Sequence, residues 1–108
     1  MSILDTETID GMAIGKGGKE LRLLINDVID WNDEYYHLLK LQEKINSYLT
    51  FCESHQYETI YENNIIKYAI FEIHFKYSPS KKAIAFLNEV QKQVNEMGIA
   101  IEYCISEE

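Results

Sequence analysis

Two stretches of the sequence repeat apolar residues at the three- and four-residue spacing of an amphipathic helix. The second stretch is the clearer of the two. Ser78 and Pro79 open it as a cap followed by a proline in the first turn, and Gly98 stands where a glycine commonly follows a helix. Its predicted core positions lie on one side of the helix: Ala83, Leu87, Val90, Val94 and Met97.

The first stretch predicts a long helix that ends near Ser54 and has Asp30 or Asn32 as its cap. If Asn32 is the cap, Trp31 and Tyr36 occupy the positions of a hydrophobic staple, which gives the single tryptophan a structural role. The side expected to face the core carries Leu38, Leu41, Ile45, Tyr48, Leu49 and Cys52. The opposite, polar side carries Lys40, Glu43, Lys44, Ser47 and Thr50.

Other segments alternate apolar and polar residues, as β-strands do. Residues 9–14 and 21–26 flank a glycine-rich turn at 15–18 and predict a hairpin. Residues 99–105 predict a closing strand with one buried face.

A second hairpin is predicted in the middle of the chain. Residues 57–61 are rich in strand-forming side chains, residues 62–64 form an asparagine-containing turn, and residues 65–77 have a long strand pattern. The odd-numbered positions of the long strand are almost wholly apolar, so we expect them to face the core.

The predicted order of elements is β-β-α-β-β-α-β, in a single α+β domain spanning residues 1–108. Apart from the extra N-terminal hairpin strand, this is the order of a ferredoxin-like βαββαβ core: a two-layer sandwich with two helices on one face of a mainly antiparallel sheet. The other face would be uncovered and would carry Tyr68, Ile70, Glu72 and His74. Such a face often serves as a dimer interface or a ligand platform.

Charge narrows the range of partners. Ten basic residues stand against eighteen acidic ones, which gives a net charge of -8 and a pI of about 4.8. We therefore expect binding neither to nucleic acid nor to an anionic membrane. The first residues lack the basic and apolar regions of a secretory signal, which favours a cytoplasmic protein, and Cys52 and Cys104 are expected to be reduced and structural.

Candidate chemistry is sparse. Asp33 and His37 are one helical turn apart, a spacing that suits two ligands or an oriented imidazole, but also an ordinary pair that supports a helix. Glu72 and His74 share one strand face with Lys76, where cross-strand charge pairing is the simpler role. No third metal ligand or nucleophile accompanies either group, so we expect no catalytic, metal-binding or cofactor-binding residues.

The first helical stretch also carries a recognisable signature. It consists of residues 29–34 (IDWNDE), His37-Leu38, residues 41–46 (LQEKIN) and Tyr48-Leu49, and residues 75–79 (FKYSP) add a second block. In these residues the chain resembles a family of small, functionally uncharacterised bacterial proteins. The resemblance implies a glycine after the first helix, where this chain has Ser54-His55-Gln56. It implies no activity, cofactor or substrate.

These observations favour a non-enzymatic cytoplasmic interaction module that forms a homodimer through the open sheet face or an edge strand. The candidate interaction surface consists of Trp31, Asp33, His37, Tyr68, Glu72 and His74. One alternative is an acidic, immunity- or antitoxin-like partner of a basic protein. Another is a small-molecule or metal-binding enzyme whose site lies near the start of the first helix.

Overall fold

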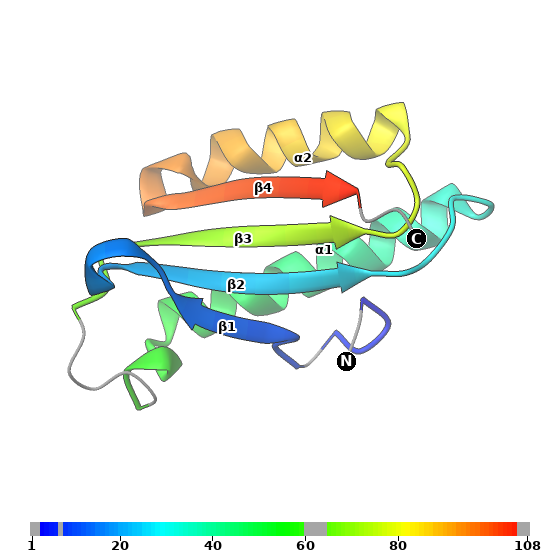
Figure 1. The fold of residues 1–108 in the computed structure, drawn as a ribbon. Coiled ribbons are helices and arrows are strands. Elements are labelled where there is room, and N and C mark those ends of the chain that lie inside the picture. The colour runs from blue at the N-terminus through cyan, green and yellow to red at the C-terminus, as the bar shows by residue number, and fades with distance from the viewer. Residues whose placement is uncertain (1–2, 7, 60–64, 106–108) are drawn as a thin grey trace.

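Four strands form one sheet in the computed structural model, which describes residues 3–6, 8–59 and 65–105 (Figure 1). The strands are β1 (Gly11–Ile14), β2 (Glu20–Asp27), β3 (Tyr68–Phe75) and β4 (Ile99–Ile105). The helices are α1 (Glu34–Glu53) and α2 (Lys81–Val94), with short 3-10 turns at Lys16–Gly18, Gln56–Thr59 and Asn95–Met97.

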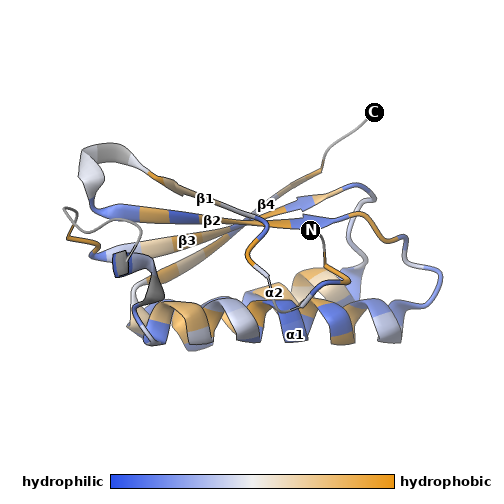
Figure 2. Cartoon of the chain, turned by 90° about the horizontal axis from the view of Figure 1, so that it is seen from below, coloured by the Kyte–Doolittle hydropathy of each residue, from blue (hydrophilic) through white to orange (hydrophobic). Residues whose placement is uncertain are grey.

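The sheet is mixed, and its spatial order β1-β2-β3-β4 follows the chain. β1 pairs antiparallel with β2, as the first hairpin predicts, whereas β2 with β3 and β3 with β4 pair in parallel. α1 and α2 are the two crossovers between the parallel strands, and both lie on the same side of the sheet (Figure 2). The expected α+β class is therefore confirmed.

The ferredoxin-like, mainly antiparallel sheet is not the arrangement observed. Residues 57–59, in the strand predicted at 57–61, lie in a 3-10 turn, and residues 60–64, including the predicted asparagine turn, lie outside the described residues. Tyr57 is buried beside the ring of Phe51, so its aromatic character serves core packing instead of strand pairing. Without a hairpin partner, β3 is reached through α1 and pairs in parallel with β2.

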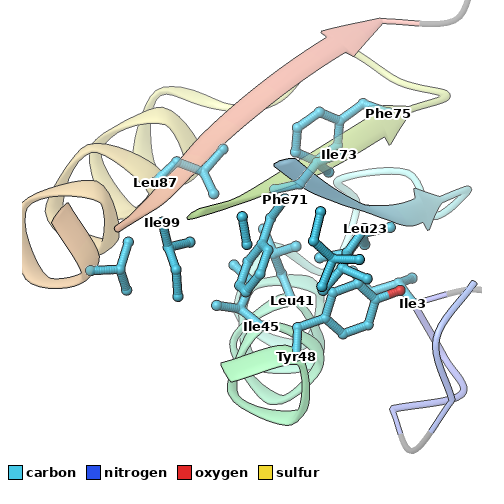
Figure 3. Close-up of a cluster of buried hydrophobic side chains, with 14 of the residues drawn as sticks. Ile3, Leu23, Leu41, Ile45, Tyr48, Phe71, Ile73, Phe75, Leu87 and Ile99 are labelled. Carbon is cyan, nitrogen blue, oxygen red and sulfur yellow. The ribbon is translucent and has the colours of Figure 1, made fainter. Parts of the chain in front are cut away.

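Alternation along β2 and β3 separates the core from the other face of the sheet. The odd-numbered side chains point toward the helices, as predicted, and are buried there: Leu21, Leu23, Ile25, Ala69, Phe71, Ile73 and Phe75. α1 contributes Leu41, Ile45 and Tyr48 to this core (Figure 3). Ile65 was expected to belong to the same face, but it precedes the strand and is 75% exposed.

The buried side of α1 includes a charged residue. Lys44, predicted on the polar side, is fully buried, and its ammonium group donates to the carbonyl oxygens of Asp5 and Thr8 and to Asp10 Oδ1 at 2.9 Å. The ammonium group has three donors, and these three acceptors use all of them. Lys44 thereby fixes the N-terminal segment against α1, a role that helical periodicity alone does not reveal.

The start of α2 also differs from the prediction. Ser80, not Ser78, is the cap, and its side chain accepts a hydrogen bond from the Ala83 amide at 3.2 Å. Pro79 is buried immediately before the cap. Gly98 follows the last helical turn with φ +75°, in the left-handed region where glycine is favoured, as the sequence predicts.

Candidate functional site

The six predicted surface residues fall into two separate groups. Trp31, Asp33 and His37 lie where β2 ends and α1 begins. Tyr68, Glu72 and His74 lie on β3, on the face opposite the helices. The structure therefore does not unite them into one site, and each group is built from its own neighbours.

His37 forms a buried pair with Asp27, the last residue of β2. Its Nε2 lies 2.7 and 2.6 Å from the two carboxyl oxygens of Asp27, and both side chains are fully buried. Its Nδ1 lies 2.9 Å from the Asp30 carbonyl oxygen, and because a carbonyl only accepts, hydrogen bonding assigns a proton to Nδ1. A second proton is then shared between Nε2 and the Asp27 carboxyl group.

The surroundings of Asp27 explain how a carboxyl group is tolerated there. Burial raises the pKa of Asp27, and the hydrogen bond and charge of His37 oppose that rise. Asp27 Oδ1 also accepts from the Ile29 amide at 3.2 Å, and the Asp27 carbonyl accepts from the Lys76 amide at 2.8 Å. The pair thus joins the ends of β2 and β3 to the first turn of α1.

Trp31 completes this cluster by covering the imidazole. Its ring stacks on His37 with centroids 3.5 Å apart and an angle of 14°, and it lies 6.1 Å from the ring of Phe75. The contact follows from the position of His37 on the helix, because His37 is the residue of the first turn of α1 that faces the core. Both nitrogens of His37 are hydrogen-bonded and one face of its ring is covered by Trp31. The cluster therefore holds the end of β2 against the start of α1.

Asp33 has a different partner from the one considered in the sequence. It is the cap of α1, in place of Asp30 or Asn32, and its side chain accepts from the Tyr36 amide at 3.2 Å. Its carboxyl group therefore serves the helix end, and His37 pairs with Asp27. The staple also differs, because Trp31 packs on His37 while Tyr36 is exposed.

Asp27 was missed in the sequence, although a signal was available. The alternation of Leu21, Leu23 and Ile25 continues to position 27, which places the carboxyl group on the buried face. A buried carboxyl group requires a hydrogen-bonding partner, and a histidine on the next helix is the simplest one.

The second group lies on what we call the uncovered face of the sheet. It consists of Glu20, Arg22, Leu24 and Asn26 of β2, Tyr68, Ile70, Glu72 and His74 of β3, and Ala100, Glu102 and Cys104 of β4. Lys76, predicted to share this face, lies beyond the end of β3 and is exposed.

Arg22 organises the uncovered face. Its guanidinium lies 2.6 Å from Glu20 Oε1, 3.2 Å from Glu72 Oε2 and 3.6 Å from Glu102 Oε1, so it contacts carboxylates from all three parallel strands. His74 Nε2 lies 3.4 Å from Glu72 Oε1. Partial burial acts to raise the pKa of Glu72, but its hydrogen bonds with Arg22 and His74 outweigh this effect and lower that pKa.

A cavity of about 280 Å³ lies at the opposite end of the sheet from the buried pair, beside the end of α1. Cys52, His55, Tyr57 and Lys67 are among the residues that line it. Burial raises the pKa of the Cys52 thiol to about 11, which leaves it protonated and poorly nucleophilic. His55 lies in the turn after α1, where the resemblance implies a glycine, and has φ +58°, in the left-handed region.

Two general features of the described residues bear on the kind of site present. They contain no group of three or more His, Cys, Asp or Glu residues placed to hold a metal ion. Neither described helix combines the length and apolar character needed to cross a lipid bilayer.

Comparisons with known proteins place the chain in a family without assigning it a role. No curated protein and no solved structure matches it. The resemblance to an uncharacterised family is confirmed: a family model covers residues 1–107, and the chain belongs to DUF6572, a family of unknown function.

Proposed function

We propose that this protein is a non-enzymatic protein-interaction module whose contact surface is the uncovered face of its sheet. The observation that supports this proposal most strongly is the placement of α1 and α2 on one side of three neighbouring parallel strands (Figure 2). Parallel strands are ordinarily covered on both faces. A partner protein seated on the second face would supply the missing layer.

The composition of the uncovered face supports this role. Leu24 gives it a half-buried apolar residue beside the buried Ile70, and Tyr68 is an exposed aromatic at its margin. Tyrosine and arginine are enriched where proteins meet, because each combines a large contact area with hydrogen-bonding capacity. Arg22 is held in place by its three carboxylate partners and is therefore ordered before a partner arrives.

Charge favours a basic partner. Three carboxylates on this face, Glu20, Glu72 and Glu102, outnumber the single guanidinium of Arg22, and the whole chain carries a net charge of -8. Complementary charge speeds association and selects against acidic partners. An immunity- or antitoxin-like role, in which the protein masks a basic surface, is the specific form of the proposal that this charge supports.

An enzyme site at the start of α1 has less support from the geometry. Such a site needs an accessible acid, base or ligand atom, whereas both nitrogens of His37 are engaged and its ring is covered by Trp31. The Asp33 carboxylate is engaged in capping α1.

The proposal is tested by capturing partners from a lysate of the source organism with immobilised protein. Tyr68→Arg combined with His74→Arg adds two positive charges to the uncovered face. The matched control, Tyr35→Arg combined with Ala85→Arg, adds the same charge at exposed positions of α1 and α2. Circular dichroism establishes that both variants are folded.

We expect a basic protein that is retained by the wild type and by the helix control and is lost from the face variant. Retention that is equal for both variants would place the contact elsewhere. Failure of the wild type to retain any specific protein would also overturn the proposal.

A further inference from the structure

The outer edge of β4 is divided into two chemically different halves. In the parallel pairing with β3, the Gly98 carbonyl accepts from the Ala69 amide, so the even-numbered residues of β4 turn their backbone groups toward β3. The amides and carbonyls of Ile99, Ile101, Tyr103 and Ile105 consequently point outward, away from the sheet. We call this row of groups the β4 edge.

The first half of the β4 edge is already occupied by a side chain of α2. Gln91 Nε2 donates to the Ile99 carbonyl at 3.1 Å, and Gln91 Oε1 accepts from the Ile101 amide at 2.7 Å. A single carboxamide thereby makes the two hydrogen bonds that a neighbouring strand would otherwise make. Pairing with another chain is blocked at this half.

The second half of the β4 edge is bare. Within the described part of the chain, the outward amides and carbonyls of Tyr103 and Ile105 have no hydrogen-bonding partner. Their side chains are 45% and 43% exposed, and Tyr103 also packs edge-on against Phe75 with ring centroids 5.8 Å apart. No lysine, proline or bulge protects this end of the strand, although edge strands commonly carry such protection.

We propose that a second copy of this chain pairs with the β4 edge in an antiparallel manner, about a two-fold axis at Cys104. Identical edges pair most simply through a self-complementary, two-fold contact. In this register Tyr103 lies opposite Ile105 of the second copy, and the two residues exchange both backbone hydrogen bonds on each side of the axis. Two four-stranded sheets then become one continuous sheet, which extends the uncovered face.

Neighbouring registers fit less well. An axis at Glu102 places two carboxylates opposite each other, which is unfavourable. An axis at Tyr103 directs the Ile105 carbonyl of one copy toward the Ile101 amide of the other, which Gln91 already occupies. Of the axes at Glu102, Tyr103 and Cys104, the one at Cys104 uses the free groups of Tyr103 and Ile105 without opposing like charges or displacing Gln91. This inference concerns the edge of the sheet and is independent of the role proposed for its face.

The register can be read by disulfide cross-linking, with Cys52→Ala in every protein. Residues directly opposite each other at a non-hydrogen-bonded position have Cα atoms about 4.5 Å apart, which suits a disulfide. One protein retains Cys104. A second carries Glu102→Cys with Cys104→Ser, and a third carries Ala85→Cys with Cys104→Ser to measure cross-linking by random collision at an exposed helix position.

Under mild oxidation we expect the protein with Cys104 to form a covalent dimer at least tenfold faster than the other two. Adding Tyr103→Lys to it should reduce the rate to that of the collision control, and sedimentation equilibrium should show a reversible dimer that this lysine abolishes. Equal rates for Cys104 and the Ala85→Cys control, faster reaction of the Glu102→Cys protein, or a strictly monomeric wild type would each overturn the proposal.

Discussion

At the scale of single residues, the Asp27–His37 pair shows how a histidine beside a tryptophan can resemble a catalytic group and still serve structure. One nitrogen of His37 is fixed by the Asp30 carbonyl and the other by Asp27, and Trp31 covers the ring. Removing one partner of such a pair leaves a buried polar group without a hydrogen bond, which costs more than the pair itself contributes.

Asp27→Asn and Asp27→Ala separate hydrogen bonding from charge. The asparagine amide can donate to His37 Nε2 and its oxygen can accept from the Ile29 amide, whereas alanine leaves both groups unpaired. We therefore expect Asp27→Ala to lower the free energy of unfolding by about 1–3 kcal/mol, and Asp27→Asn to lower it less at neutral pH. Urea denaturation measures both.

The pH dependence of these variants has a defined sign. Burial raises the pKa of Asp27, so the native state holds this proton at pH values where the unfolded chain has released it. The stability that the native state gains from binding this proton is fully present below pH about 3.9, the ordinary pKa of aspartate. It is lost as the pH rises through the raised pKa of Asp27 in the native state. Asp27→Asn should thus gain stability relative to wild type as pH rises; a constant difference from pH 4 to 7 would refute this assignment.

The backbone conformation of a single residue, His55, determines how α1 ends. Its φ of +58° places a non-glycine residue in the left-handed region immediately after the helix, where the family resemblance leads us to expect glycine. Its Nδ1 lies 2.9 Å from the Tyr57 hydroxyl, a partly exposed contact that offsets little of the backbone cost.

Replacing His55 tests this assignment through a series of side chains. Glycine should raise the free energy of unfolding by about 0.5–1 kcal/mol, because it adopts a positive φ without a steric penalty. Asparagine should have little effect, and the β-branched valine should destabilise the protein by about 1–2 kcal/mol. Thermal denaturation gives the order, and a valine variant as stable as the glycine variant would contradict it.

At the scale of elements, periodicity located both helices and the first hairpin but not every surface that they bury. Helical periodicity predicts Lys44 on the polar side of α1, where lysine is usually found, but its three oxygen acceptors come from a segment more than thirty residues away. Similarly, the aromatic residues at 57–61 predict a strand, although Tyr57 packs into the core from a 3-10 turn. In both cases tertiary packing overrides the intrinsic preference of the residue, for the surface at Lys44 and for a strand at Tyr57.

The uncovered face shows what sequence alone could and could not supply. Alternation along β3 correctly put Glu72 and His74 on one face. The Arg22 network was missed, because its members come from three strands whose order depends on parallel pairing. The sequence predicts a second hairpin in place of the parallel pairing of β2 with β3, and a hairpin does not bring Glu72 and Glu102 beside Arg22.

At the scale of the whole molecule, α1 and α2 pack on one side of the sheet and leave the uncovered face and the free half of the β4 edge open to contact (Figures 1 and 2). Both are parts of the sheet, and neither requires an accessible catalytic group. The proposed role as an interaction module therefore depends on the sheet and not on the buried pair at the start of α1.

Hydroxyl-radical footprinting can show whether a partner covers the uncovered face, since it reports the exposure of individual side chains. The protein is oxidised in a lysate of its source organism and, separately, as purified dilute protein. We predict that Tyr68 and His74 become protected in the lysate while Tyr35, 79% exposed on the outer side of α1, reacts equally in both. Equal reactivity of Tyr68 and His74 in the two samples would contradict the proposal that a partner covers the uncovered face.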